Sequence, residues 1–396
     1  MKRTTSLFRT IMSLVLCVCM LSMMVACKGK DNKPDDGTTQ TTGETGTQGT
    51  EPSGTQGTEP SGTQGTEPSG TQATEPKPTE PKPTEPKPTE PKPTETEPTE
   101  CKPTEPKPTE TEPAKDPNIY EHVIVIGVDG AGVFFQNVDT PNYDRIFANG
   151  ATTYSAQTEY PSHSAESWAS LLHGVTCEYH GVTDANAGTY VYPRDDAFPS
   201  IFRAIKEQNS KVKLASFATW PHLNYSIVEN GFGVHKGGSA SGDTITMNEV
   251  LPYISSNKPD FLFLQLDCVD YAGHSQGYGG ELYQSEIKWI DVQIGRLYKA
   301  YEDAGIIDET LFIVTADHGG IGTTHGGSTE VEMTIMFAAT GKTVQKGTIG
   351  EMGIRDTAAI VMHALGYEQP DTWTARVPSG LFKGVTAGER PVYNGD

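Results

Sequence analysis

The chain has 396 residues and a formal net charge of −21 at pH 7. Such an acidic protein is not expected to bind duplex nucleic acid electrostatically, although bound cations could still admit small phosphorylated ligands. Its six cysteines are too few and too scattered for a disulfide scaffold.

The first 27 residues have the layout of an export signal. Basic residues at positions 2, 3 and 9 precede an apolar run over 11–26, which is short for a membrane span. The run ends in Val25-Ala26-Cys27, and small residues directly before a cysteine resemble the bacterial lipobox. This resemblance implies lipid attachment at Cys27 and an exported protein anchored on the outer face of the cell membrane. The alternative is a plain secretory signal cut nearby.

Residues 28–117 are a low-complexity linker. Thr-Gln-Gly-Thr-Glu-Pro-Ser-Gly repeats give way to Thr-Glu-Pro-Lys-Pro repeats, with almost no apolar side chains. No core can form from them, so we expect a disordered stalk, flexible in its glycine-rich half and extended in its proline-rich half. Its threonines are candidates for O-glycosylation on composition alone.

Residues 118–396 are enough for one α/β domain with a substantial core. Apolar, β-branched runs predict strands and amphipathic periodicity predicts helices. We expect strands at 122–128, 151–156, 213–217, 261–266, 311–314 and 333–339, and helices at 140–147, 164–173, 199–208, 246–256, 281–303 and 356–365.

Carboxylates and imidazoles follow three of these strands. Asp129 ends the first one, Asp270 and His274 lie on a glycine-containing turn after 261–266, and the segment after 311–314 carries Asp317, His318 and His325. Strand ends are where ligands gather in α/β sheets, and this mixture of side chains can hold a divalent metal. Each motif alone could equally be an ordinary hydrogen-bonded turn.

Ser164 opens a predicted helix that Gly174 closes. It could simply be the N-cap, which serine favours. The positive end of a helix also favours an anion, so a serine there could attack phosphorus if a metal stabilised its alkoxide.

These stretches together resemble the alkaline phosphatase superfamily. The resemblance rests on Val128-Asp129-Gly130, Ser164-Ala165-Glu166-Ser167 with Gly174 beyond, Glu178-Tyr179-His180-Gly181, Asp270 to His274, and Asp317-His318 with His325. It is closest to the nucleotide pyrophosphatase/phosphodiesterase branch. It implies a three-layer α/β/α sandwich with a largely parallel central sheet.

The resemblance also implies the site. Two divalent ions, best Zn²⁺, would lie about 4 Å apart. One would be held by Asp129, Ser164, Asp317 and His318, and the other by Asp270, His274 and His325. Ser164 would be the nucleophile, with Thr158 and Ser162 as alternatives because the branch's usual threonine motif resembles residues 158–163. Asn186 resembles a phosphate-contacting asparagine.

The expected activity is hydrolysis of a small phosphate ester. No Arg or Lys lies between Ser155 and Val191, which favours diesters over monoesters. A phosphomonoesterase, a phosphonate hydrolase and an inactive surface binding module remain alternatives, whereas Ser164 lacks the Cys/Ser-x-Pro-x-Arg context of sulfatases. The sequence carries no signal for an oligomeric state.

Overall fold

The computed structural model describes residues 119–395. The predicted signal segment, the predicted lipidation site Cys27 and the predicted stalk therefore lie outside the described residues. Within 119–395, none of the helices is both long and apolar enough to cross a bilayer. Cys177 and Cys268, the cysteines of this range, are both free.

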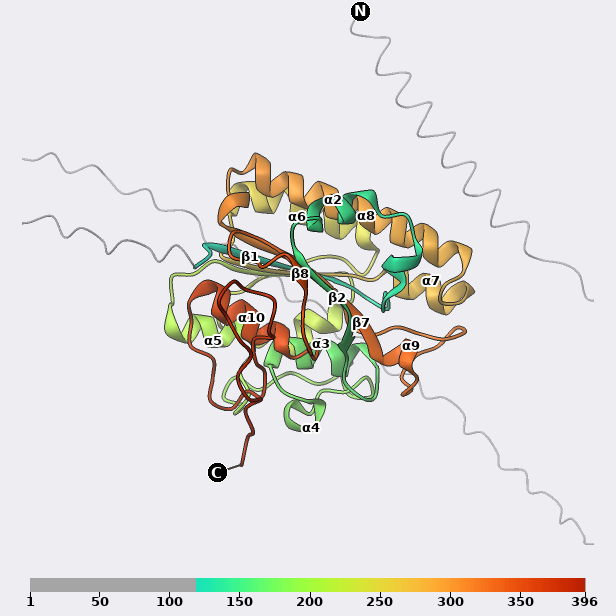
Figure 1. Ribbon diagram of the computed structural model, residues 1–396. Coiled ribbons are helices and arrows are strands. Elements are labelled where there is room, and N and C mark those ends of the chain that lie inside the picture. Colours follow the sequence, from blue (N-terminus) through green and yellow to red (C-terminus); the bar gives the residue numbers. More distant parts are fainter. Residues whose placement is uncertain (1–118, 396) are drawn as a thin grey trace, which may run out of the picture. The chain divides into compact units, whose positions relative to one another are not determined.

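An eight-stranded sheet forms the centre of the domain (Figure 1). Its order is β4-β3-β5-β1-β6-β7-β2-β8, and β7 alone of these eight strands runs against the others. This confirms the largely parallel sheet. The strands are β1 (His122–Val128), β2 (Ala151–Gln157), β3 (Leu214–Ala218), β4 (His235–Gly237), β5 (Phe261–Leu266), β6 (Thr310–Ala316), β7 (Thr334–Thr340) and β8 (Gly347–Thr348).

Helices cover both faces of the sheet, as Figure 1 shows. One layer holds α2 (Pro141–Phe147), α6 (Asp243–Asn257), α7 (Cys268–Gln276) and α8 (Glu281–Asp303). The other holds α3 (Ser164–His173), α4 (Cys177–His180), α5 (Ile201–Gln208) and α10 (Asp356–Leu365). The predicted α/β/α sandwich is confirmed. Shorter helical segments are η1 (Phe134–Asn137), η2 (Leu223–Ile227), η3 (Ile307–Glu309) and α9 (Glu330–Met333).

One local prediction was wrong. Asp270 and His274 lie on the helix α7 and not on a turn. A glycine is needed at position 273 of this helix, because the ring of Tyr278 fills the space beside it and a Cβ would lie only 2.7 Å from that ring. The carboxylate of Asp243 accepts hydrogen bonds from the backbone N–H groups of Asp267 and Cys268, and so caps the start of the helix.

Strand β1 is buried along its whole length between β5 and β6. Trp168 of α3 packs against it, fully buried, and its indole N–H donates to Asp129 Oδ2 at 2.9 Å. A Cβ on Gly127 would lie only 2.3 Å from the Trp168 ring. The missing side chain at Gly127 therefore makes room for the indole that orients Asp129.

We expect Gly127→Ala to destabilise the protein by about 1–3 kcal/mol, because the added methyl group overpacks the core against Trp168. Urea unfolding of the full chain measures the change. Gly388→Ala is the matched control, since a Cβ there meets nothing within 4 Å. Equal stabilities of the two variants would contradict the role given to Gly127.

Candidate metal centre

Three buried side chains meet at the ends of β1 and β6. Asp129 follows β1, and Asp317 and His318 follow β6. The Nε2 atom of His318 lies 3.5 Å from Asp129 Oδ1 and 3.4 Å from Asp317 Oδ2. Ser164 Oγ completes the group, 3.1 Å from His318 Nε2 and 3.4 Å from Asp129 Oδ1.

The outer carboxylate oxygens of Asp129 and Asp317 each accept two hydrogen bonds. Asp129 Oδ2 accepts from Trp168 and Gln265, and Asp317 Oδ1 accepts from the backbone N–H groups of Gly130 and His318. Asp317 Oδ2, which faces the group, has no hydrogen-bond partner. Burial and the nearby Asp270 charge raise the pKa of Asp129 to about 7, and burial and the Asp129 charge raise the pKa of Asp317 well above its usual range.

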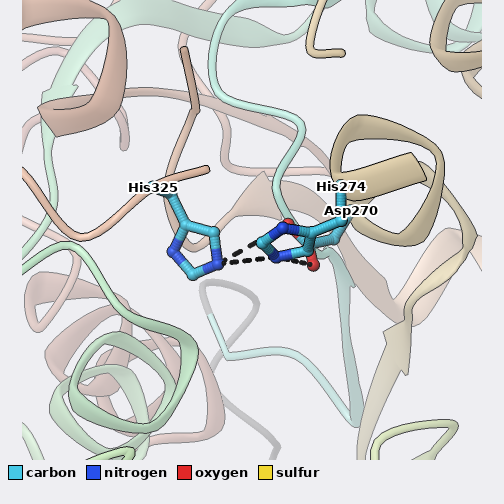
Figure 2. A group of neighbouring side chains, drawn as sticks. All are labelled: Asp270, His274 and His325. Atoms are coloured by element: carbon cyan, nitrogen blue, oxygen red, sulfur yellow. Dashed lines mark hydrogen bonds and ion pairs between the residues drawn. The ribbon is translucent and has the colours of Figure 1, made fainter. Parts of the chain in front are cut away.

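A second group lies at the rim of the same site (Figure 2). It consists of Asp270, His274 and His325. The Nε2 atoms of the two histidines face each other at 3.1 Å, and Asp270 Oδ2 lies 3.3 Å from His274 Nε2. Although burial opposes it, hydrogen bonding to His274 and the neighbouring imidazoles lower the pKa of Asp270 to about 2. The hydrogen bond to Asp270 raises the pKa of His274 to about 9, and burial lowers the pKa of His325 to about 4.

Backbone carbonyls fix the orientation of all three histidines. The Nδ1 atom of His318 lies 2.9 Å from the carbonyl oxygen of Gly319, that of His274 lies 2.9 Å from Thr323, and that of His325 lies 2.9 Å from Ser162. A carbonyl can only accept, so each Nδ1 carries the proton. Each Nε2 atom is then directed at the carboxylates, and without a proton it presents the lone pair that a metal ligand requires.

The two groups are joined. The imidazole rings of His318 and His325 stack with centroids 3.8 Å apart and planes at 13°. The turn after β1 lies in close contact with Asp270, because a Cβ on Gly130 would lie 2.5 Å from Asp270 Oδ1. The φ of Gly130, +65°, also favours glycine at this position. The groups therefore form one centre.

This donor set fits divalent cations. Three carboxylates and three Nε2 atoms converge, one inward carboxylate oxygen has no hydrogen-bond partner, and the Nε2 atoms of His274 and His325 face each other at hydrogen-bonding distance. Without positive charge this arrangement is repulsive, and imidazole with carboxylate is a ligand mixture that Zn²⁺ accepts. The structure thus brings together all seven residues that the sequence assigned to metal ligation.

The three candidate nucleophiles lie in different surroundings. Ser164, the first residue of α3, borders the metal centre. Ser162 is fully buried, and its hydroxyl bonds the backbone of Gly326 and Gly327. Thr158 donates to Ser167 in the core. Ser164 is therefore the one hydroxyl of these three that contacts a candidate ligand.

A cavity of about 390 Å³ opens beside Ser164. Asp184, Trp220, His222 and Asp267 line it together with the rim histidines. Asn186 does not: its side chain accepts from Thr183 N–H and donates to the carbonyl of Gly181, and so closes the loop after α4. Asp184 is the polar residue of this loop that borders the cavity.

Sequence reasoning missed several supporting residues. Gln265 was assigned only to a strand, yet its amide donates to both Asp129 and Asp267. The hydroxyl of Tyr278 donates to Asp270, and its ring packs edge-on against His274 and His325. A polar residue inside the apolar run 261–266 was the available signal for Gln265. No local pattern marks Tyr278 or Asp184.

Comparison with known proteins places this centre in context. A family model described as type I phosphodiesterase / nucleotide pyrophosphatase matches residues 123–372. GPI ethanolamine phosphate transferase 1 of Saccharomyces cerevisiae is 25% identical over 189 residues, 44% of this chain and 20% of the yeast protein. The match thus spans a fifth of that relative.

Solved structures share the fold. Murine ectonucleotide pyrophosphatase / phosphodiesterase 5 is 16% identical, with a TM-score of 0.53 over 62% of this chain and 95% of that one. The human protein gives 14% identity and a TM-score of 0.53 over 63% and 96%. A putative sulfatase from Bacteroides fragilis gives 13% and 0.51 over 69% and 80%.

The family match covers more than half of the chain, and the matched range contains every residue of the two metal-binding groups. The sheet and helix layers agree with those of the solved structures. The chain therefore belongs to the type I phosphodiesterase / nucleotide pyrophosphatase family, hydrolases of the alkaline phosphatase superfamily that act on phosphoester bonds.

Proposed function

We propose that this protein is an exported, lipid-tethered phosphodiesterase that uses Ser164 as its nucleophile and two divalent cations, best Zn²⁺. The observation that carries the proposal is the common tautomer of His274, His318 and His325, whose Nε2 atoms all face the carboxylates. Cys27 would hold the protein on the outer face of the membrane, and residues 28–117 would space the catalytic domain from it.

The residues of the centre would have separate roles in binding the cations and positioning the nucleophile. Asp129, Asp317 and His318 would hold one cation with Ser164, and Asp270, His274 and His325 the other. Bound there, the cations would stabilise the Ser164 alkoxide and neutralise the charge of the phosphoryl oxygens. Asp129 and His318 position Ser164 Oγ.

The reaction takes place in two steps. Ser164 Oγ loses its proton and bonds to phosphorus, while the bond from phosphorus to the leaving alcohol oxygen breaks and the alcohol leaves with a proton. Water then bonds to phosphorus, the Ser164 ester bond breaks, and the serine hydroxyl is restored. The products are the alcohol and a phosphomonoester.

A diester is favoured over a monoester by the charge around Ser164. A dianionic monoester needs additional cationic contacts, but no lysine or arginine is among the described residues that line the cavity. The inactive binding module is disfavoured because both ligand groups are complete.

Transfer to an alcohol is a second candidate, supported by the similarity to the yeast ethanolamine phosphate transferase. The first step is the same. An alcohol would then take the place of water and receive the phosphoryl group from Ser164, so the outcome depends on which hydroxyl reaches the ester.

We expect Ser164→Ala to lower kcat by at least about 10³-fold while the protein still binds metal, since the nucleophile is lost and six ligands remain. Rates with p-nitrophenyl phosphate, bis-p-nitrophenyl phosphate and thymidine monophosphate nitrophenyl ester measure this, and the diesters should react faster. Ser162→Ala and Thr158→Val are the matched controls. Activity retained by Ser164→Ala but lost in a control would transfer the nucleophile role to that residue.

We expect Asp317→Asn to stabilise the metal-free protein by about 1–3 kcal/mol at pH 8 and to weaken metal binding. The amide keeps an acceptor for Gly130 and His318 but removes a buried charge. The raised pKa of Asp317 means that the folded state binds the extra proton, so metal-free wild type should lose stability as pH rises from about 5 to 8, and the variant less.

Urea unfolding in chelator and in Zn²⁺ at both pH values tests this prediction. Exposed Asp308→Asn, at the opposite end of β6, is the control for net charge. A metal-free Asp317→Asn protein less stable than wild type at pH 8 would contradict the repulsion inferred for the centre.

A further inference from the structure

The cavity beside Ser164 has an acidic side. Asp184 Oδ1 accepts from the backbone N–H of Ala165, the second residue of α3, and its Oδ2 lies 3.7 Å from His163 Nδ1. The carboxylate is held in place yet keeps 41% of its side chain exposed. Because it is bonded to the residue next to Ser164, any phosphorus that Ser164 attacks lies close to this negative charge.

No lysine or arginine on the cavity wall balances Asp184 within residues 119–395. The other ionisable residues of the wall are Asp267, Asp270 and the three histidines His222, His274 and His325. The three carboxylates of the metal centre would offset three of the four positive charges of two bound divalent cations, and the phosphodiester anion would offset the fourth. A further anionic group on the substrate would therefore be repelled by Asp184.

An aromatic wall lies in the same cavity. Trp220 lines it, and the backbone N–H of Trp220 donates to Gln265 Oε1 at 2.8 Å, which fixes the residue to the end of β5. Its ring meets His222 edge-on with centroids 5.2 Å apart. Ala187 and Gly188 contribute little bulk to the lining. An indole together with a fixed carboxylate is the combination that recognises an ammonium group.

We propose that this cavity binds the ammonium group of a zwitterionic phosphodiester, with Asp184 supplying the opposite charge and Trp220 the aromatic face. The substrate class is then an ester of phosphocholine or phosphoethanolamine. The inference rests on the proposed function. It adds the identity of the ester group that stays on phosphorus after Ser164 has displaced the leaving alcohol. Nucleotides with further phosphates are disfavoured by the same carboxylate.

Three nitrophenyl diesters test the assignment. They carry choline, its uncharged isostere 3,3-dimethylbutanol, or thymidine as the retained ester. In each, Ser164 Oγ bonds to phosphorus and p-nitrophenolate leaves, and water then releases the retained monoester from Ser164. We expect kcat/KM for the choline ester to exceed that for the isostere by about 5–30-fold. This is the range expected when an ammonium group lies on the face of an indole and close to a carboxylate.

Asp184→Asn and Trp220→Leu should each reduce this choline-to-isostere ratio at least threefold. The asparagine keeps the acceptor for Ala165 N–H, so the start of α3 is preserved. Asp308→Asn makes the same change of net charge far from the cavity and should leave the ratio unchanged.

Inhibition of wild type gives a readout that needs no variant. Tetramethylammonium should inhibit bis-p-nitrophenyl phosphate hydrolysis competitively, and 3,3-dimethylbutanol at least five times more weakly. Glycerophosphocholine and phosphatidylcholine vesicles, assayed for phosphocholine release, then distinguish a soluble from a lipid-borne ester.

Equal rates with the choline ester and its isostere, together with no inhibition by tetramethylammonium, would overturn the inference. So would a choline preference that survives both cavity substitutions, since the ammonium would then bind elsewhere. Failure to hydrolyse any of the three diesters in the presence of Zn²⁺ would instead overturn the proposed function on which the inference rests.

Discussion

Mutual repulsion of three enclosed carboxylates is the constraint on which this domain depends. Asp129, Asp270 and Asp317 come from segments that follow three adjacent parallel strands, β1, β5 and β6. The outer oxygens of Asp129 and Asp317 are held by backbone, indole and amide donors, so the inner oxygens are forced toward one another. Such convergence costs free energy unless cations offset it. The surrounding packing keeps these carboxylates in place: Gly127, for example, leaves room for Trp168, whose indole N–H donates to Asp129.

One short segment unites the two ligand groups. Asp317 and His318 belong to the buried group and His325 to the rim group, although only six residues separate the two histidines. The turn between them folds the chain back so that the imidazoles stack. The carbonyl oxygens of Gly319 and Thr323 also come from this segment, and they orient His318 and His274. A change in this segment therefore reaches both groups.

The fold alone does not decide the reaction. Similar sheets and layers are found in ectonucleotide pyrophosphatase / phosphodiesterase 5 and in a putative sulfatase. The differences lie in the side chains around the nucleophile. Here Ser164 is bordered by a carboxylate and an indole, and the cavity wall lacks a basic residue within the described chain. Charge around the reacting phosphorus is thus the property by which this centre would select its ester.

The sequence by itself determined six of the eight strands of the sheet, most of the longer helices and the seven candidate ligands, because buried strands are apolar runs and their polar ends are visible locally. Only the tertiary structure decided that Asp270 and His274 lie on a helix, since Asp243 caps it and Tyr278 fills the space at Gly273. It also placed Asp184, not Asn186, on the cavity. Loop positions and histidine tautomers depend on contacts between segments distant in sequence, and no periodic pattern encodes such contacts.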